Sequence, residues 1–287
     1  MVLFNFLRKK NNYSQDSEIT NPRIAEEVLT KRFFIEGDLA DGDKLYGMTE
    51  AGQVRENNED FFMLAPQLGL SILADGMGGH NAGEIASQIA TQCYFSYFKQ
   101  EIQNRKFEKD NLEQEIQLLL TEAFEEANSA ILQLADENPL YRGMGTTMIT
   151  AFLQENQLYL SHIGDVRAYL FHQDELTQLT EDHSVVWELF KEGKITKEEA
   201  RQSKIKNQIT KALGIGLKPD PSFYTHSLTK GDKLMLCSDG LWDMLPDEEI
   251  GKIIRQDNSA QTITKNLVEA ANKAGGYDNI TVITYLH

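Results

Sequence analysis

The chain has 287 residues, of which 41% are apolar and 25% are charged; this apolar content can fill a core, which excludes a wholly disordered chain. Its 28 Lys and Arg against 44 Asp and Glu give a formal net charge of −16, which excludes sequence-independent binding to nucleic acid, because the phosphates would be repelled. Cys93 and Cys237 are the two cysteines, and both lie in apolar stretches far apart in the chain. They exclude a disulfide framework and predict buried, reduced thiols, as expected in the cytoplasm.

Residues 1–43 have a polar, irregular pattern that differs from the rest of the chain. They begin with MVLFNFLRKK, in which apolar residues precede three basic ones, whereas a secretion signal has the reverse order. This stretch is too short for a membrane span, which needs about 20 apolar residues. It is typical either of a frayed terminus or of a weak interfacial anchor or docking arm. We therefore expect an N-terminal extension over residues 1–43 and one domain over residues 44–287.

From Leu45 onward the spacing of apolar residues becomes regular. Apolar runs bounded by turn residues predict strands, and apolar residues spaced by three and four predict helices. In chain order the expected elements are strands Phe61–Leu64 and Gly69–Ala74, helices Glu84–Ile102 and Leu112–Ala135, strands Thr146–Leu153, Gln157–Ile163, Val166–Phe171 and Glu175–Leu179, helices Val185–Gly193 and Thr196–Gln202, strand Lys233–Ser238, helices Asp247–Arg255 and Ala260–Lys273, and strand Asn279–Leu286. The strands come in hairpin-like groups separated by helices, which indicates an α+β domain with antiparallel sheets covered by helices.

Three aspartates lie at glycine-rich turns beside apolar strands: Asp75 in SILADGMGG, Asp239 in LMLCSDG and Asp278 in GGYDNITVI. A single Asp-Gly pair is usually only a turn. Repetition at the ends of buried strands indicates that the carboxylates converge in space, where their repulsion must be compensated. A hard divalent cation such as Mg²⁺ or Mn²⁺ would do this, and Gly76 leaves room for its own backbone carbonyl to approach the cation.

A further polar cluster, Arg55 to Asp60 (RENNED), runs directly into the first expected strand of the domain. Arg55 beside Glu59 and Asp60 is typical of a structural ion pair, or of a planar guanidinium that holds a phosphate dianion facing the metal ions. The sequence of this cluster leaves both interpretations open.

At this point the sequence resembles the metal-dependent serine/threonine protein phosphatases of the 2C type, the PPM family, and above all their short bacterial members. The matching segments, all in the order of the family, are VRENNEDFF (54–62), ILADGMGGHNAGEIAS (72–87), MGTTMITAFL (144–153), LSHIGDVRAYL (160–170), LTQLTEDHS (176–184), ITKALG (209–214), GDKLMLCSDGLWDML (231–245) and GGYDNITVI (275–283). The resemblance implies an αββα four-layer sandwich with two central antiparallel sheets flanked by helices. It also implies a mobile flap over residues 184–208.

The resemblance also implies roles for single residues. Asp75 would bridge two metal ions, with the Gly76 carbonyl on one of them and with Asp239 and Asp278 on the other. Asp60 would bind or support these ions, with Glu59 as the alternative. The remaining implied roles are a phosphate contact for Arg55, a weaker third ion for Asp165, and a general acid or leaving-group contact for His80, whose alternative is a structural role at a helix start.

Together these roles imply hydrolysis of phosphoserine and phosphothreonine in proteins, by a water that two Mn²⁺ or Mg²⁺ ions make acidic. They further imply a cytoplasmic monomer that acts on phosphorylated proteins and opposes a serine/threonine kinase. Lys211 replaces the arginine usual in the ITRALG segment, and Ser203-Lys204 stands where a His-Pro pair is common. Both departures concern substrate preference. The alternatives are a phosphatase dedicated to one regulatory protein and a catalytically inactive binding module, but the retained aspartates and Arg55 favour an enzyme.

Overall fold

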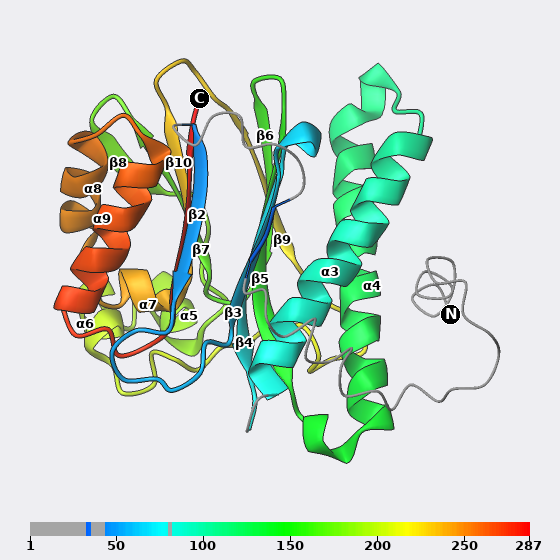
Figure 1. Cartoon of the computed structure of the whole chain (residues 1–287), viewed down its shortest axis with the longest axis horizontal. Helices are drawn as coiled ribbons and strands as arrows, with labels where there is room; N and C mark the ends of the chain where they lie inside the picture. Colours follow the sequence, from blue (N-terminus) through cyan, green and yellow to red (C-terminus); the bar gives the residue numbers. More distant parts are fainter. Residues whose placement is uncertain (1–32, 36–43, 80–81) are drawn as a thin grey trace. The chain divides into compact units, whose positions relative to one another are not determined.

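Two β-sheets lie face to face at the centre of the unit formed by residue Phe33 onward (Figure 1). The structure is a computed structural model, and it describes residues 33–35, 44–79 and 82–287. Sheet A has the strand order β1-β3-β4-β5-β6-β9, and its pairs are antiparallel except for the parallel pair β1 and β3. Its strands are β1 (Phe33–Ile35), β3 (Asp60–Ala65), β4 (Leu70–Met77), β5 (Gly145–Gln154), β6 (Gln157–Ile163) and β9 (Ser222–Ser227).

Sheet B is antiparallel throughout and has the order β2-β11-β10-β7-β8. Its strands are β2 (Leu45–Glu50), β7 (Arg167–His172), β8 (Glu175–Gln178), β10 (Lys233–Cys237) and β11 (Ile280–Leu286). Chain segments far apart in sequence therefore meet here, because β2 from the start of the domain pairs with β11 from its end.

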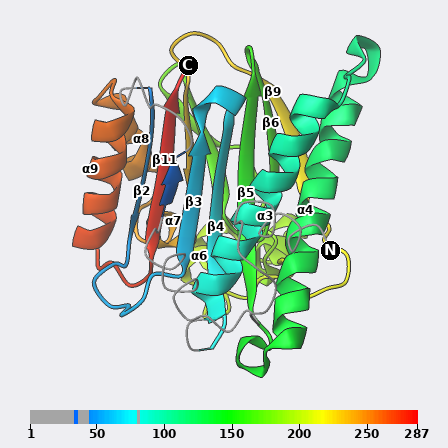
Figure 2. The same ribbon diagram turned by 45° about the vertical axis from the view of Figure 1, so that its right-hand side comes forward.

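Helices cover the outer face of each sheet, as Figures 1 and 2 show. The long helices α3 (Ala82–Asn104) and α4 (Leu112–Glu137) lie on sheet A. The helices on sheet B are α7 (Asp239–Trp242), α8 (Asp247–Arg255) and α9 (Ala260–Lys273). Two short helices, α5 (Val185–Lys191) and α6 (Lys197–Gln202), and three single 3₁₀ turns complete the described elements: Pro66–Leu68, Lys109–Asn111 and Pro139–Tyr141. The expected αββα sandwich is confirmed.

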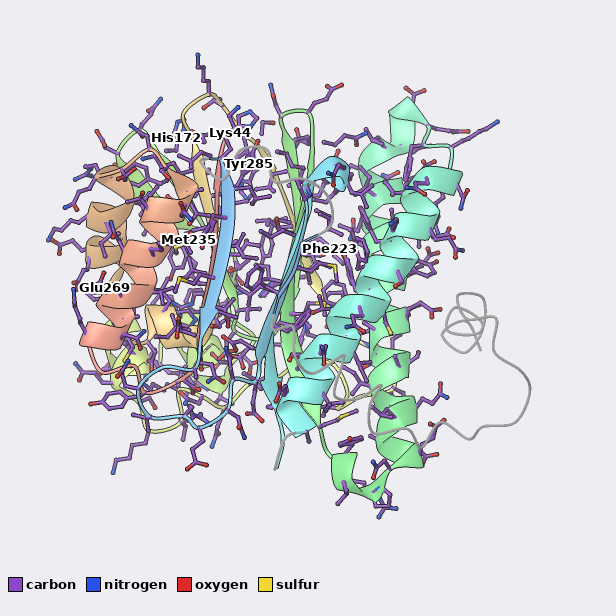
Figure 3. All side chains as sticks on the ribbon, in the orientation of Figure 1. Lys44, His172, Phe223, Met235, Glu269 and Tyr285 are labelled. Atoms are coloured by element: carbon purple, nitrogen blue, oxygen red, sulfur yellow. The ribbon has the colours of Figure 1, made fainter. Side chains whose placement is uncertain are left out.

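The core consists of three layers of apolar side chains, one between the sheets and one beneath each helical face. Figure 3 labels one residue near each layer: Tyr285 packs against the layer between the sheets, Phe223 against the α3–α4 layer, and Met235 lies in the α8–α9 layer. All six residues of β3 are buried, because this strand has packed side chains on both faces. Burial of this kind stabilises a fold by about 25 cal/mol per Å² of apolar surface.

The expected helices and strands are confirmed, most of them within two residues, whereas β1, β2, β9 and α7 escaped the sequence analysis. In β2 a glycine interrupts the apolar pattern. A Cβ at Gly47 would lie 2.5 Å from the Phe62 ring, so the close approach of the two sheets requires glycine there. β9 is missed because its sequence, SFYTHS, is polar and its residues are only partly buried.

Three residues from the expected extension take part in sheet A. Phe33–Ile35 pairs with Phe62–Leu64 as an edge strand, and the chain from Phe33 onward groups into one compact unit. The MVLFNFLRKK stretch lies outside the described residues. Within the described part of the chain, no helix is both long enough and apolar enough to cross a membrane. Cys93 and Cys237 are buried free thiols, as expected.

The expected flap, residues 184–208, contains α5 and α6. Ser184 caps α5 by accepting a hydrogen bond from the Trp187 backbone N–H, and Thr196 and Glu199 form a reciprocal capping box on α6. A bridge between Ser184 and Ile209 brings the two ends of the segment together. The flap therefore consists of two capped helices, and the bridge between Ser184 and Ile209 closes the segment at its base.

Candidate metal centre

The first pair of candidate ligands comes from adjacent strands of sheet A. Asp60, the first residue of β3, lies directly opposite Asp75 on β4. Residues paired in this way have Cβ atoms about 4.5–5.5 Å apart. Gly76 follows, and a Cβ there would lie 2.0 Å from the Gly83 carbonyl oxygen, so only glycine allows the start of α3 to approach this strand end.

The second pair comes from the same end of sheet B, near the label α7 in Figure 1. Asp239 begins α7 just after β10, and Asp278 precedes β11. A Cβ at Gly240 would lie 2.1 Å from the Asn279 carbonyl oxygen, so α7 packs directly on the segment that carries Asp278. The other end of the two sheets is marked in Figure 3 by the labelled residues Lys44 and His172.

Asp60 connects the two sheets. Its Oδ2 accepts hydrogen bonds from the Ser238 hydroxyl at 2.7 Å and from the Thr281 hydroxyl at 2.6 Å, both on the sheet B side. Its Oδ1 is buried and receives no hydrogen bond from the described residues. A buried carboxylate oxygen without a donor is costly unless a cation or a proton compensates it.

The carboxylates of this cluster repel one another. Burial, followed by the charges of neighbouring aspartates, holds the pKa of Asp75 and of Asp239 well above the usual range. Burial raises the pKa of Asp60 to about 6, and burial together with the charge of Asp182 raises that of Asp165 to about 7. Such shifts arise where carboxylates gather without a positive partner.

The donor set fits a hard divalent cation. Carboxylate oxygens, a backbone carbonyl at Gly76 and the orphaned Oδ1 of Asp60 are ligands of the kind that Mg²⁺ and Mn²⁺ prefer. Among residues 33–35, 44–79 and 82–287, no three His, Cys, Asp or Glu side chains already have the close arrangement of a complete metal-ligand group. The structure thus brings the expected aspartates into one electrostatic cluster, and the roles of single ligands stay predictions.

Arg55 and Glu59 lie beside the cluster in different ways. The Arg55 guanidinium donates to Asp278 at 2.7 Å, and half of its side chain is exposed. Glu59 accepts a hydrogen bond from the Gly83 backbone N–H at the start of α3. A carboxylate at a helix N-terminus stabilises the helix, so Glu59 supports α3. Burial, and to a smaller extent the charge of Asp278, also raises the pKa of Glu59, so this carboxyl lies at the edge of the same cluster.

Asp165 occupies the turn between β6 and β7, and it is only 5% exposed. Asp165 is therefore a buried acid in a connection between the two sheets, since β6 lies in sheet A and β7 in sheet B. The Trp242 indole donates to the Asp165 backbone carbonyl at 3.1 Å. Arg167 stacks 3.7 Å above the Trp242 ring and forms a two-pronged hydrogen bond with Asp182. This set of contacts joins the Asp165 turn to α7 and thereby to Asp239.

Two further residues, Asn279 and Asp243, contribute to the site. Asn279 accepts from the Glu59 backbone N–H at 2.8 Å and donates to the carbonyls of Ala51 and Asn57, so it fixes the loop that carries Arg55. Asp243 raises the pKa of Asp239 and Asp165 through its charge, and it follows the SDG segment by one helical turn, a spacing that could have pointed to it. His80, by contrast, lies outside the described residues.

The raised carboxyl pKa values predict an unusual pH dependence of stability. A carboxyl group with a raised pKa stabilises the fold at low pH and loses this contribution as the pH rises through its folded pKa. The buried histidines His162 and His183, with pKa values lowered by burial to about 4 and about 3, act in the opposite direction below about pH 6.5. Four carboxyl groups, those of Asp60, Asp75, Asp165 and Asp239, have raised pKa values against these two histidines. We therefore expect the melting temperature in EDTA to fall as the pH rises from 5 to 8, with the histidines offsetting part of the fall below about pH 6.5.

Differential scanning calorimetry between pH 5 and pH 8 measures this profile. Each group contributes at most about 1.4 kcal/mol per pH unit, so a loss of about 1–2 kcal/mol is expected between pH 6.5 and pH 8. Saturating Mn²⁺ should abolish the fall on the alkaline side, because a cation then replaces the protons. A melting temperature that rises steadily to pH 8 in EDTA would show that the carboxylates are not under mutual repulsion.

Comparisons with known proteins agree with this geometry. Residues 50–278 match the family model described as protein phosphatase 2C. The protein phosphatase PhpP of Streptococcus pneumoniae is 40% identical over 239 residues, which cover 82% of this chain and 94% of PhpP. The crystal structure of the Mycobacterium tuberculosis serine/threonine phosphatase PstP/Ppp superposes with a TM-score of 0.76 at 36% identity and covers 85% of this chain and 98% of that one.

A second crystal structure, of the catalytic domain of PstP with two manganese ions, has a TM-score of 0.72 and 36% identity. It covers 85% of this chain and 97% of that domain. The residues matched by the family model include every aspartate of the carboxylate cluster. The chain therefore belongs to the protein phosphatase 2C family, whose members are metal-dependent protein serine/threonine phosphatases.

Proposed function

We propose that this chain hydrolyses phosphoserine and phosphothreonine in proteins, using divalent cations held where the two sheets end. The main support is the cluster of buried carboxylates with raised pKa values at this end of the sheets, in which the Oδ1 atom of Asp60 has no hydrogen-bond donor among the described residues. Asp75 is paired with Asp60 across the sheet, and the charges of Asp60 and Asp239 both act on it, which supports a role for Asp75 in bridging two ions. The Gly76 carbonyl would be a further ligand of one ion, and Asp239 and Asp278 would bind the other.

When bound, a pair of Mn²⁺ or Mg²⁺ ions lowers the pKa of water enough to supply a nucleophile near neutral pH. The two manganese ions in the PstP catalytic domain support this number of core ions. The chain's own residues hold and orient the reactants. Asp165, buried and fixed by Trp242, would hold a weaker third ion on the Asp239 side. His80 would contribute as a general acid or through a contact with the leaving group.

Arg55 would bind the phosphate. Its half-exposed guanidinium can leave Asp278 once a cation neutralises that carboxylate, and it then offers two parallel donors to a phosphate dianion. The sequence alternative of a purely structural ion pair makes a different prediction, because it does not involve substrate.

The proposal is tested by phosphate release from phosphothreonine and phosphoserine peptides in Mn²⁺. Arg55→Met should lower kcat/KM about 10- to 100-fold, mostly through KM, because a charge-assisted hydrogen bond to phosphate contributes about 1.5–3 kcal/mol. Arg255→Met is a matched control, since Arg255 is 54% exposed and pairs with Asp174 on the surface. No release from any phosphoserine or phosphothreonine peptide would contradict the function, and an unchanged KM would return Arg55 to a structural role.

We also propose that catalysis requires only the unit that begins at Phe33. Deletion of residues 1–32 should leave turnover of a small aryl phosphate within about three-fold, because the candidate ligands all lie in the later unit. Deletion of residues 1–43 also removes β1, which pairs with β3, and should lower the melting temperature. A folded but inactive 33–287 chain would show that the extension contributes to the catalytic site.

The substrate chemistry implies a partner. Phosphate on serine or threonine side chains must be supplied by a serine/threonine kinase, so the proposal includes such a kinase acting on the same proteins. The buried free thiols support a cytoplasmic location, where cysteines stay reduced, and we propose that the chain acts as a monomer. A comparison of phosphoproteomes with and without the protein separates a general phosphatase from one dedicated to a single regulatory protein.

A further inference from the structure

Basic side chains of the flap are attached to the helices that follow Asp239. The Lys206 ammonium donates to both carboxylate oxygens of Asp243, at 2.6 and 2.5 Å. Arg201 donates to the backbone carbonyl of Asp243 at 3.4 Å, and Lys197 pairs with Asp247 at 2.8 Å. The flap is therefore held against α7 and the start of α8 by three cationic groups.

Asp243 belongs to a corner of the carboxylate cluster, which we call the Asp165 corner and define as Asp165, Asp239 and Asp243. The Asp243 backbone N–H bonds to the Asp239 carbonyl at 2.9 Å, so the two side chains are one helical turn apart and lie on the same face. Trp242, between them in sequence, holds the Asp165 carbonyl. The charge of Asp243 is felt by both other carboxyl groups of the corner.

The contact between Lys206 and Asp243 is partly shielded from water. The Lys206 side chain is 30% exposed and that of Asp243 18%. Water screens an ion pair in such a position less than it screens one on the open surface. Since an ammonium group is a compact positive charge, Lys206 stands in for a cation at the edge of the Asp165 corner.

We propose that Lys206 competes with a divalent cation for the Asp165 corner, so that cation binding there releases the flap and flap docking weakens the cation. This inference rests on the proposed function only for the identity of the weaker third ion. A divalent cation at the corner would recruit Asp243 or repel Lys206, and either effect breaks the same ion pair. Linkage requires the two effects to be reciprocal: whatever loosens the flap must tighten the cation by the same factor.

The Mn²⁺ binding isotherm, measured by electron paramagnetic resonance of free Mn²⁺, tests whether docking of Lys206 weakens cation binding. Lys206→Met keeps the aliphatic length but removes the charge, and it should tighten the weakest class of bound Mn²⁺ about five-fold or more. Lys206→Arg should behave like the wild type. Lys204→Met is the matched control: Lys204 is exposed and, within the described residues, forms no ion pair. An unchanged weak class in Lys206→Met, or equal tightening in Lys204→Met, would overturn the proposal.

Proteolytic cleavage of the flap tests whether cation binding releases the flap. Endoproteinase Glu-C cuts after Glu188, Glu192, Glu198 and Glu199, which the lysine substitutions leave intact. In the wild type, cleavage should accelerate over the Mn²⁺ concentrations that fill the weak class, whereas Lys206→Met should be cleaved rapidly without Mn²⁺. A wild-type cleavage rate independent of Mn²⁺ would overturn the inference. Both measurements omit substrate, so failure of phosphate release would be distinguished from failure of the competition.

Discussion

Asp239→Asn is expected to lower the turnover of a phosphothreonine peptide about 10³-fold, because a metal-held charge contributes several kcal/mol to the transition state and each 1.36 kcal/mol is a factor of ten. Asparagine keeps the shape of the side chain and removes its charge. Asp239 begins α7 and packs through Gly240 on the segment that carries Asp278, so its loss removes a ligand between two strand ends. Phosphate release at saturating peptide and a fixed Mn²⁺ concentration measures the effect.

The same substitution should stabilise the metal-free chain. The pKa of Asp239 is raised by burial and by the charges of Asp165, Asp278 and Asp60, so removal of its charge relieves repulsion at pH 7.5. We expect a higher melting temperature than that of the wild type in EDTA. Asp174→Asn is the control, since Asp174 is an exposed turn residue with a left-handed backbone that asparagine also adopts. A variant that keeps near-normal turnover would remove Asp239 from the candidate ligands.

The sequence predicted the parts of the site that depend on local patterns. Asp75, Asp239 and Asp278 each lie beside an apolar strand, and buried strands of two packed sheets end together, so their convergence followed from the periodicity. The long helices α3 and α4 followed from apolar residues at helical spacing. The αββα sandwich and the roles of individual site residues were predicted from the resemblance to a phosphatase family, because residue spacing alone does not predict them.

The rest depends on contacts between segments far apart in the chain. Asp60 is held by hydroxyl groups of Ser238 and Thr281, and no local pattern marks these two residues as its partners. The pair of Lys206 with Asp243 joins the flap to α7, and its members are 37 positions apart. β2 contains a glycine that only the closeness of Phe62 explains. Tertiary contacts of this kind override or extend local preferences and become visible only in the folded chain.

Removal of divalent cations should abolish activity and reduce stability together. With EDTA the water in the site returns to its ordinary pKa, and turnover of phosphopeptide should fall by at least about 10⁴-fold. At pH 7.5 the unneutralised carboxylates repel each other, as their raised pKa values indicate. The melting temperature should therefore also fall, and re-addition of Mn²⁺ should restore both properties, because the fold itself is retained. A free Mn²⁺ concentration of 100 times the dissociation constant would stabilise the fold by about 2.7 kcal/mol per site.

The most direct measurement is phosphate release from a phosphothreonine peptide by the full chain, first dialysed against EDTA and then titrated with Mn²⁺, with bound Mn²⁺ counted in the same samples. We predict no release without cation and a rise in release that follows the filling of the tight Mn²⁺ sites. Asp239→Asn should bind less Mn²⁺ at each concentration and release correspondingly little phosphate. Full turnover in excess EDTA, or turnover that is unrelated to the number of bound ions, would contradict a metal-dependent phosphatase centre at these carboxylates.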